Sequence, residues 1–197
     1  MKTLNKLALG VLAIVAIAFT GKLEDGNYNV SLEKSKVEWV GKKVTGQHNG
    51  TVAIKSGALN IKDGKLNGGE FIIDMTTLTS TDLEGEYQQK LNGHLKSDDF
   101  FGIEKFPEAK FVITKVAKDS KNGSFAVTGN LTIKSTTKPV SFKAQLVNGG
   151  TGIIAVADIV IDRSEYDVRY GSGSFFDDLG DKTIYDDFTL SINLVTE

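Results

Sequence analysis

Residues 125–134 read FAVTGNLTIK, and in them apolar side chains or glycine alternate with small or polar residues. Successive side chains of a β-strand point to opposite faces of the sheet, so this period of two predicts a strand with one buried face. The same period recurs in the segments 71–75, 140–146, 153–161 and 188–194. We therefore expect a chain built mostly of half-buried antiparallel strands.

Turn-forming residues lie between these segments. Asparagine, aspartate and glycine tolerate the positive φ of a tight hairpin, which predicts short connections between neighbouring strands. Such pairs and triplets occur at 49–50, 63–64, 67–69, 122–123 and 148–150. We expect the strands to run mostly up and down.

One segment, 80–95, departs from the strand pattern because its apolar residues recur at every fourth position. These residues are Leu83, Tyr87 and Leu91. The spacing predicts a short amphipathic helix, with Thr81 and Glu84 as a capping box at its start and Gly93 at its end. One helix among many strands favours a closed or nearly closed antiparallel barrel, because closure removes exposed sheet edges; a two-sheet sandwich is the alternative.

The composition is that of an ordinary globular chain with one domain. It has 197 residues, of which 40% are hydrophobic and 24% charged, and it contains no Cys. The net charge of -2 argues against a nucleic-acid partner, since such partners are bound through a strongly positive surface. The lack of cysteine excludes disulfides, a thiolate nucleophile, cysteine-ligated metal sites and a lipidated cysteine anchor.

Residues 1–20 differ in character from the rest of the chain. Two lysines precede an uncharged apolar run, which contains the small-x-small pattern AIA at 16–18 that signal peptidase recognises. We expect a signal peptide over 1–20, cleaved near Ala18, and a mature domain over 25–197. The apolar run falls short of the roughly 20 residues that span a bilayer, so no stable membrane anchor is expected.

No catalytic or metal site stands out. His48 lies in a loop-like string at 46–50 and His94 follows the predicted helix, a spacing that suggests neither a metal pair nor a nucleophile with its base. A group of aspartates near the C-terminus does not match the ligand spacing of a calcium loop and is expected to be solvated. They are Asp177, Asp178, Asp181, Asp186 and Asp187. We expect no catalytic residue, no metal and no cofactor.

Several strings carry a family resemblance. Residues 95–111 contain LKSDDFF followed by EKFPEAKF, and residues 129–140 contain GNLTIK followed by TKPV. With WVGKK at 39–43 and IDRSEY at 161–166, they make the chain resemble the YceI-like family over residues 28–195. The resemblance implies a lipocalin-like antiparallel β-barrel of about eight strands with one short α-helix. It also implies a periplasmic or secreted protein that holds a polyisoprenoid or another long-chain amphiphile, such as a fatty-acyl compound, in a hydrophobic tunnel, without catalysis.

A barrel of about eight strands either fills with side chains or encloses one small ligand. Its inward faces here mix large residues with glycine and alanine, so both outcomes stay open. If a tunnel exists, strand parity places a defined set of side chains on its wall. They are Trp39, Phe71, Ile73, Phe111, Ile113, Phe125, Val127, Leu131, Ile133 and Phe142. A phosphate or carboxylate head group would then meet Lys43, His48 and Arg163, although Arg163 fits a structural ion pair equally well.

Two other functions fit the same residues. A metal- or histidine-dependent enzyme would use His48, His94 and nearby carboxylates, and a secreted interaction module would dock a protein through the aromatic segment 170–185. Pairing of two barrels in a homodimer also stays open.

Overall fold

The computed structural model describes residues 23–118, 124–148 and 152–197. The expected signal peptide and the turn residues at 122–123 and 149–150 lie outside the described residues. In the part of the chain that is described, no helix is long and apolar enough to cross a membrane.

The described residues form nine strands, one α-helix and two short 3-10 helices. The strands are β1 (Gly26–Asn29), β2 (Lys36–Lys43), β3 (Gly46–Lys62), β4 (Lys65–Ser80), β5 (Glu108–Lys118), β6 (Phe125–Ile133), β7 (Thr136–Asn148), β8 (Ile153–Asp162) and β9 (Ile184–Val195). The helices are α1 (Gly85–Lys96) and the 3-10 helices η1 (Arg163–Tyr166) and η2 (Gly180–Lys182).

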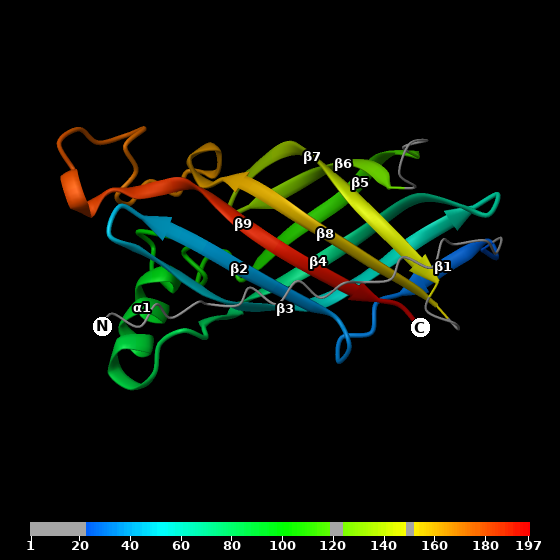
Figure 1. Ribbon diagram of the computed structural model, residues 1–197, viewed down its shortest axis with the longest axis horizontal. Helices are drawn as coiled ribbons and strands as arrows, with labels where there is room; N and C mark the ends of the chain where they lie inside the picture. Colours follow the sequence, from blue (N-terminus) through cyan, green and yellow to red (C-terminus); the bar gives the residue numbers. More distant parts are fainter. Residues whose placement is uncertain (1–22, 119–123, 149–151) are drawn as a thin grey trace, which may run out of the picture.

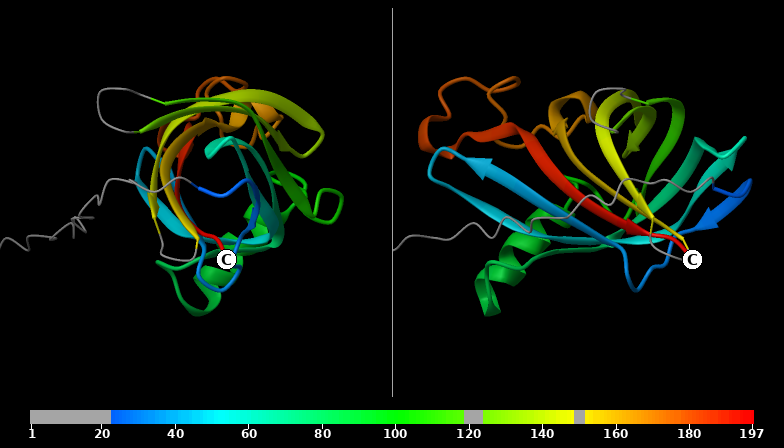
Figure 2. Two further views of the ribbon diagram at one scale, coloured as in Figure 1. Left: turned by 90° about the vertical axis from the view of Figure 1, so that its right-hand side faces the viewer. Right: turned by 45° about the vertical axis from the view of Figure 1, so that its right-hand side comes forward.

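Antiparallel pairing runs in the order β1-β3-β2-β9-β8-β7-β6-β5-β4, and a further pairing of β3 with β4 joins the sheet to itself. Strands β2 to β9 therefore close into an eight-stranded barrel, which Figures 1 and 2 show from the side and along its axis. The predicted antiparallel barrel is confirmed, and the sandwich alternative is wrong. With its edges paired, the barrel buries one face of every strand in a single interior.

Closure depends on the long strand β3. On one edge, β3 pairs with β2 through residues 46–52 and with β1 through residues 58–61. On the other edge it pairs with β4, and the register shifts between Thr51 and Ala53 and again between Ile54 and Ser56. Such bulges increase the local bend and twist of a strand pair, which lets this long hairpin curve around the barrel.

The turn prediction was right for the pair at 63–64 and wrong for the pair at 49–50 and the triplet at 67–69. Asp63 and Gly64 join β3 to β4 with φ values of 52° and 70°. In contrast, the pair at 49–50 and the triplet at 67–69 lie inside β3 and β4. At Gly50 the reason is close approach, because a Cβ there would lie 1.9 Å from the Thr79 carbonyl oxygen and 2.6 Å from the Trp39 ring.

The helix prediction was right in type and wrong at both ends. α1 begins at Gly85 rather than 80, and its N-cap Glu84 makes no side-chain capping bond, so the predicted capping box does not form. Gly93 lies within the helix, which ends at Lys96, and the N–H of the C-cap residue Ser97 donates to the Gly93 and His94 carbonyl oxygens. Tyr87 is 74% exposed, so it is not part of the inward face. Hydrogen bonds of Gln88 and Asn92 with the end of β4 hold α1 in place, together with the apolar contact of Leu95 with the core.

Candidate functional site

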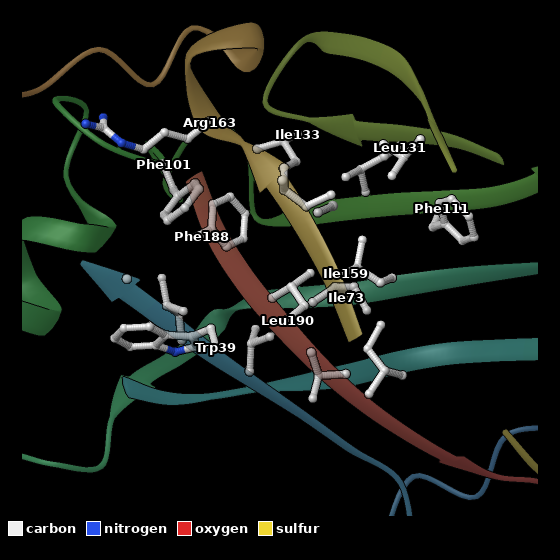
Figure 3. Close-up of a pocket in the computed structure, with 18 of the residues that line it drawn as sticks. Trp39, Ile73, Phe101, Phe111, Leu131, Ile133, Ile159, Arg163, Phe188 and Leu190 are labelled. Atoms are coloured by element: carbon white, nitrogen blue, oxygen red, sulfur yellow. The ribbon is translucent and has the colours of Figure 1, made fainter. Parts of the chain in front are cut away.

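The barrel encloses an apolar cavity of about 530 Å³. Inward-facing side chains from all the strands β2 to β9 line it, and α1 adds Leu91 and Leu95 at one end. Figure 3 shows Ile73, Phe111, Ile159 and Leu190 directed into this space. Its volume lies within the range of ordinary small-molecule sites.

Most of the wall residues expected from strand parity lie on this cavity. They are Trp39, Phe71, Ile73, Phe111, Ile113, Val127, Leu131, Ile133 and Phe142. The exception is Phe125, the first residue of β6, which is not among the lining side chains. The period of two tells which face of a strand is inward, but the distance that the cavity extends along the strand depends on the packing of other elements.

The small residues expected to leave space do so at some positions only. Gly129 does not, because a Cβ there would lie 2.4 Å from the Phe111 ring, which occupies the position. Ala144, Ala155 and Ala157 line the cavity on the adjacent strands β7 and β8, and Ala144 is paired directly with Ala157. The space therefore lies beside this group of alanines.

Polar side chains gather where the cavity meets α1, the β2–β3 turn and the start of β9. Those that line it are Lys42, Lys43, Gln47, His48, His94, Arg163, Tyr170, Asp181, Lys182 and Tyr185. All three residues predicted for a head group, Lys43, His48 and Arg163, lie in this set. Lysine and arginine outnumber carboxylates in it, so this end of the cavity favours an anionic or strongly polar group.

His48 lies in β3, opposite Gly41 of β2, and not in a loop as its neighbouring glycines suggested. Its Nδ1 lies 2.8 Å from Asp82 Oδ2, and the Asn49 N–H donates to Asp82 Oδ1. Burial by itself would raise the pKa of Asp82, but the hydrogen bonds from His48 and Asn49 outweigh it and hold the pKa below its ordinary value of 3.8. Asp82 thus orients the ring and leaves Nε2 as the nitrogen that can meet a ligand.

Arg163 is a buried cation, 2% exposed, at the end of β8 (Figure 3). Its guanidinium donates to the carbonyl oxygens of Val168, Ile184 and Tyr185 and lies 3.4 Å from Asp186 Oδ1. Burial lowers the pKa of Arg163, against the opposing charges of Asp186 and Asp162. These bonds join η1 to the start of β9, so Arg163 gives this end of the cavity its shape as well as positive charge.

Trp39 lies inside the barrel wall, against Gly50, and is 8% exposed. Among the described residues its Nε1 has no hydrogen-bond acceptor. A buried indole N–H normally finds a partner, so this atom is a feature of the cavity wall that a packed core would not leave.

An aromatic cluster that was not expected from the sequence lines the cavity at the α1 end. His94 lies in the last turn of α1, and its ring packs edge-on against Phe100 and Tyr170 with centroids 5.6 and 4.3 Å away. Phe101 continues the cluster to Phe188 on β9. The string DDFF carries part of the family resemblance, but no local period connects it with Tyr170 or His94.

The acidic residues near the C-terminus do not come together as a group of ligands among the described residues. No group of three or more His, Cys, Asp or Glu side chains is placed to hold a metal among the described residues. Asp186 differs from the expected solvated carboxylate, because it accepts a hydrogen bond from Ser174 Oγ at 2.6 Å and pairs with Arg163.

Comparison with known proteins gives the same fold. The chain is 34% identical over 125 residues to a UPF0312 protein of Vibrio parahaemolyticus, covering 60% of this chain and 61% of that one. It is 35% identical over 74 residues to Protein YceI of Escherichia coli O157:H7, covering 38% and 37%. The chain thus spans between about a third and two thirds of the length of these curated relatives.

Solved structures match more completely at lower identity. BcnA of Burkholderia cenocepacia has a TM-score of 0.68 at 23% identity, covering 85% of this chain and 99% of that one. A domain from Saccharophagus degradans, described as a polyisoprenoid binding domain implicated in plant cell wall breakdown, has a TM-score of 0.62 at 13% identity, covering 86% and 97%. At these identities the likeness shows a shared fold. The model of the YceI-like domain matches residues 28–196, nearly the whole described barrel, and the chain therefore belongs to the YceI-like domain family.

Proposed function

We propose that this protein binds one long-chain amphiphile, a polyisoprenoid or a fatty-acyl compound, inside the barrel, and carries or stores it. The observation that carries the proposal is the apolar cavity of about 530 Å³ that follows the inward faces of the strands. Side chains fill the core of an ordinary small barrel, whereas here space remains beside Ala144, Ala155 and Ala157.

The apolar wall is sufficient to hold such a chain. Each methylene removed from water contributes about 0.8 kcal/mol, so burial of about ten gives about 8 kcal/mol before the cost of association. Length and bend of the chain would then decide which molecules fit.

The polar head of the amphiphile would lie at the α1 end. Among the groups there that can donate to a phosphate or carboxylate, Lys43 and the Nε2 of His48 are those expected from the sequence, with Lys42 and Lys182 beside them. Arg163 adds charge, but most of its donors are engaged by backbone carbonyls. We therefore assign direct head-group contact to Lys43 and His48, and an indirect influence to Arg163.

The ligand class draws support from one fold neighbour. The Saccharophagus degradans domain is described as a polyisoprenoid binding domain, which makes polyprenyl compounds the first class to test. Binding rather than catalysis is the activity proposed, in the periplasm or outside the cell, with residues 1–20 removed on export. Determination of the N-terminus of the exported protein tests that last point.

Ligand binding is tested with a fluorescent fatty-acyl or polyprenyl probe. Ala157→Phe places a large ring in the cavity and is expected to lower probe affinity at least roughly tenfold, since several methylenes lose their space. Val160→Phe, on the outward face of the same strand, is the matched control because Val160 is 62% exposed. Equal affinity in Ala157→Phe and Val160→Phe would contradict binding inside the barrel.

A further inference from the structure

Large apolar side chains that remain exposed are concentrated at the α1 end of the barrel. We call this set the rim; it comprises Val44, Tyr87, Tyr170, Phe175, Phe176 and Tyr185. They belong to the β2–β3 turn, to α1, to the segment between η1 and β9, and to the start of β9, which lie at the same end in Figure 1. Tyr170 and Tyr185 also line the cavity, so the rim is continuous with its wall.

The rim aromatics project from a loop with a defined structure. Ser172 is fully buried, and its hydroxyl accepts the Ser174 N–H, while Ser174 Oγ donates to Asp186. The Ile184 N–H donates to the Gly171 carbonyl oxygen at 2.8 Å and ties the loop to β9. These bonds fix the shape of the loop that leaves Phe175 and Phe176 41% and 49% exposed. Exposed apolar groups held in this way mark an interaction surface.

We propose that the rim docks the open end of the barrel onto the interface of a lipid bilayer. Aromatic side chains favour the boundary between head groups and acyl chains, and the lysines Lys42, Lys43 and Lys182 beside them match lipid phosphates. The continuity of rim and cavity gives a hydrophobic molecule a path from the bilayer into the barrel without crossing water. In this sense the docking rests on the proposed function.

The charges of the same region define which bilayer is favoured. The loop of residues 167–183 carries Asp177, Asp178 and Asp181, which offset the positive charge of Lys42, Lys43 and Lys182. A strongly anionic surface therefore offers little extra attraction, and the aromatic side chains carry the binding. The expected behaviour is docking to zwitterionic phosphatidylcholine that depends weakly on salt.

Co-sedimentation of the mature protein with phosphatidylcholine vesicles tests the docking. Replacing both rim phenylalanines, Phe175→Ser with Phe176→Ser, is expected to lower vesicle partitioning roughly tenfold, because two aromatic side chains leave the interface. The matched control replaces two exposed apolar residues outside the rim, Leu32→Ser with Val160→Ser, and is expected to bind like the wild type. Circular dichroism verifies that both variants keep the fold.

Three results would overturn the docking proposal. The first is that the wild-type protein stays in the supernatant, and the second is that the rim variant sediments as well as the wild type. The third is that analytical ultracentrifugation shows a wild-type dimer that the rim substitutions dissociate. Failure here is distinct from failure of the proposed function. A lipid-loaded protein that ignores vesicles removes only the docking, and a vesicle-binding protein whose cavity takes no lipid removes only the proposed cargo.

Discussion

The two ends of the barrel are built from the same strands, but their polar groups have different surroundings. At the β1 end, Ile61 and Ile153 are 2% and 0% exposed. The polar groups there bond to neighbouring segments: the Thr196 hydroxyl accepts the Ile153 N–H, and the Ser31 N–H donates to the Val195 carbonyl oxygen. This end is a packed core closed by both termini of the barrel domain.

At the α1 end, lysines, histidines and Arg163 border the cavity, and aromatic side chains remain exposed around it. The β1 end shows that this fold can close with buried apolar side chains and hydrogen bonds between neighbouring segments. Packing therefore does not require the charged and exposed aromatic side chains of the α1 end. We infer that the residues that stabilise the fold and those that bind a ligand lie mainly at opposite ends of the barrel axis. We expect substitutions at the β1 end to change stability, and those at the α1 end to change mainly what is bound.

The largest expected loss of stability is an exception to this rule, because the substitution lies at the α1 end. Arg163→Met removes a buried cation from the α1 end and leaves three carbonyl oxygens and Asp186 without their partner. We expect the free energy of unfolding to fall by about 3 kcal/mol. Denaturant titration measures it, and a loss below about 1 kcal/mol would show that Arg163 is not the structural link described above.

A somewhat smaller loss is expected at the packed end. Ile61→Ala leaves a cavity in the core and should lower the free energy of unfolding by about 2 kcal/mol, without changing probe affinity. Val160→Ala, on an exposed face, is the control and should change stability by less than about 0.5 kcal/mol. If Ile61→Ala weakened probe binding more than stability, the separation of the two ends would fail.

A change in binding with only a small loss of stability, below about 1 kcal/mol, is expected at the α1 end of the cavity. Lys43→Ala with His48→Ala should weaken a fatty acid roughly tenfold, the size of one or two charge-assisted hydrogen bonds, and leave its neutral methyl ester unaffected. Lys62→Ala, an exposed lysine at the β1 end of β3, should alter neither affinity. Equal losses for the acid and the ester would place the head group elsewhere.

The smallest effect concerns pH. Because the pKa of Asp82 is lowered in the folded protein, its stabilisation is present above the ordinary carboxyl value of 3.8 and is lost as the pH falls through the lower folded value. Asp82→Asn should therefore cost less than about 1 kcal/mol at neutral pH, and the difference from wild type should vanish in acid. Unfolding curves at both pH values measure it; a difference that grows in acid would contradict the assignment.

The sequence predicted the barrel and most of its wall because alternation is a local property of each strand. Lys43, His48 and Arg163, expected at a head group, lie at one end of the cavity, and their contact with a ligand stays a prediction. The sequence misplaced Phe125 and the turn at 49–50, because the reach of the cavity and the close approach of Trp39 to Gly50 depend on distant segments. The aromatic cluster of His94, Phe100 and Tyr170 was not predicted for the same reason, since these rings meet only through tertiary packing.

The most direct test of the central claim is native mass spectrometry of the protein purified from its own cells, followed by organic extraction. We expect one polyprenyl or fatty-acyl molecule per wild-type chain, retained in Val160→Phe and absent from Ala157→Phe. A wild-type protein that carries no lipid and takes up none from an added polyprenyl or fatty-acyl pool would contradict the claim.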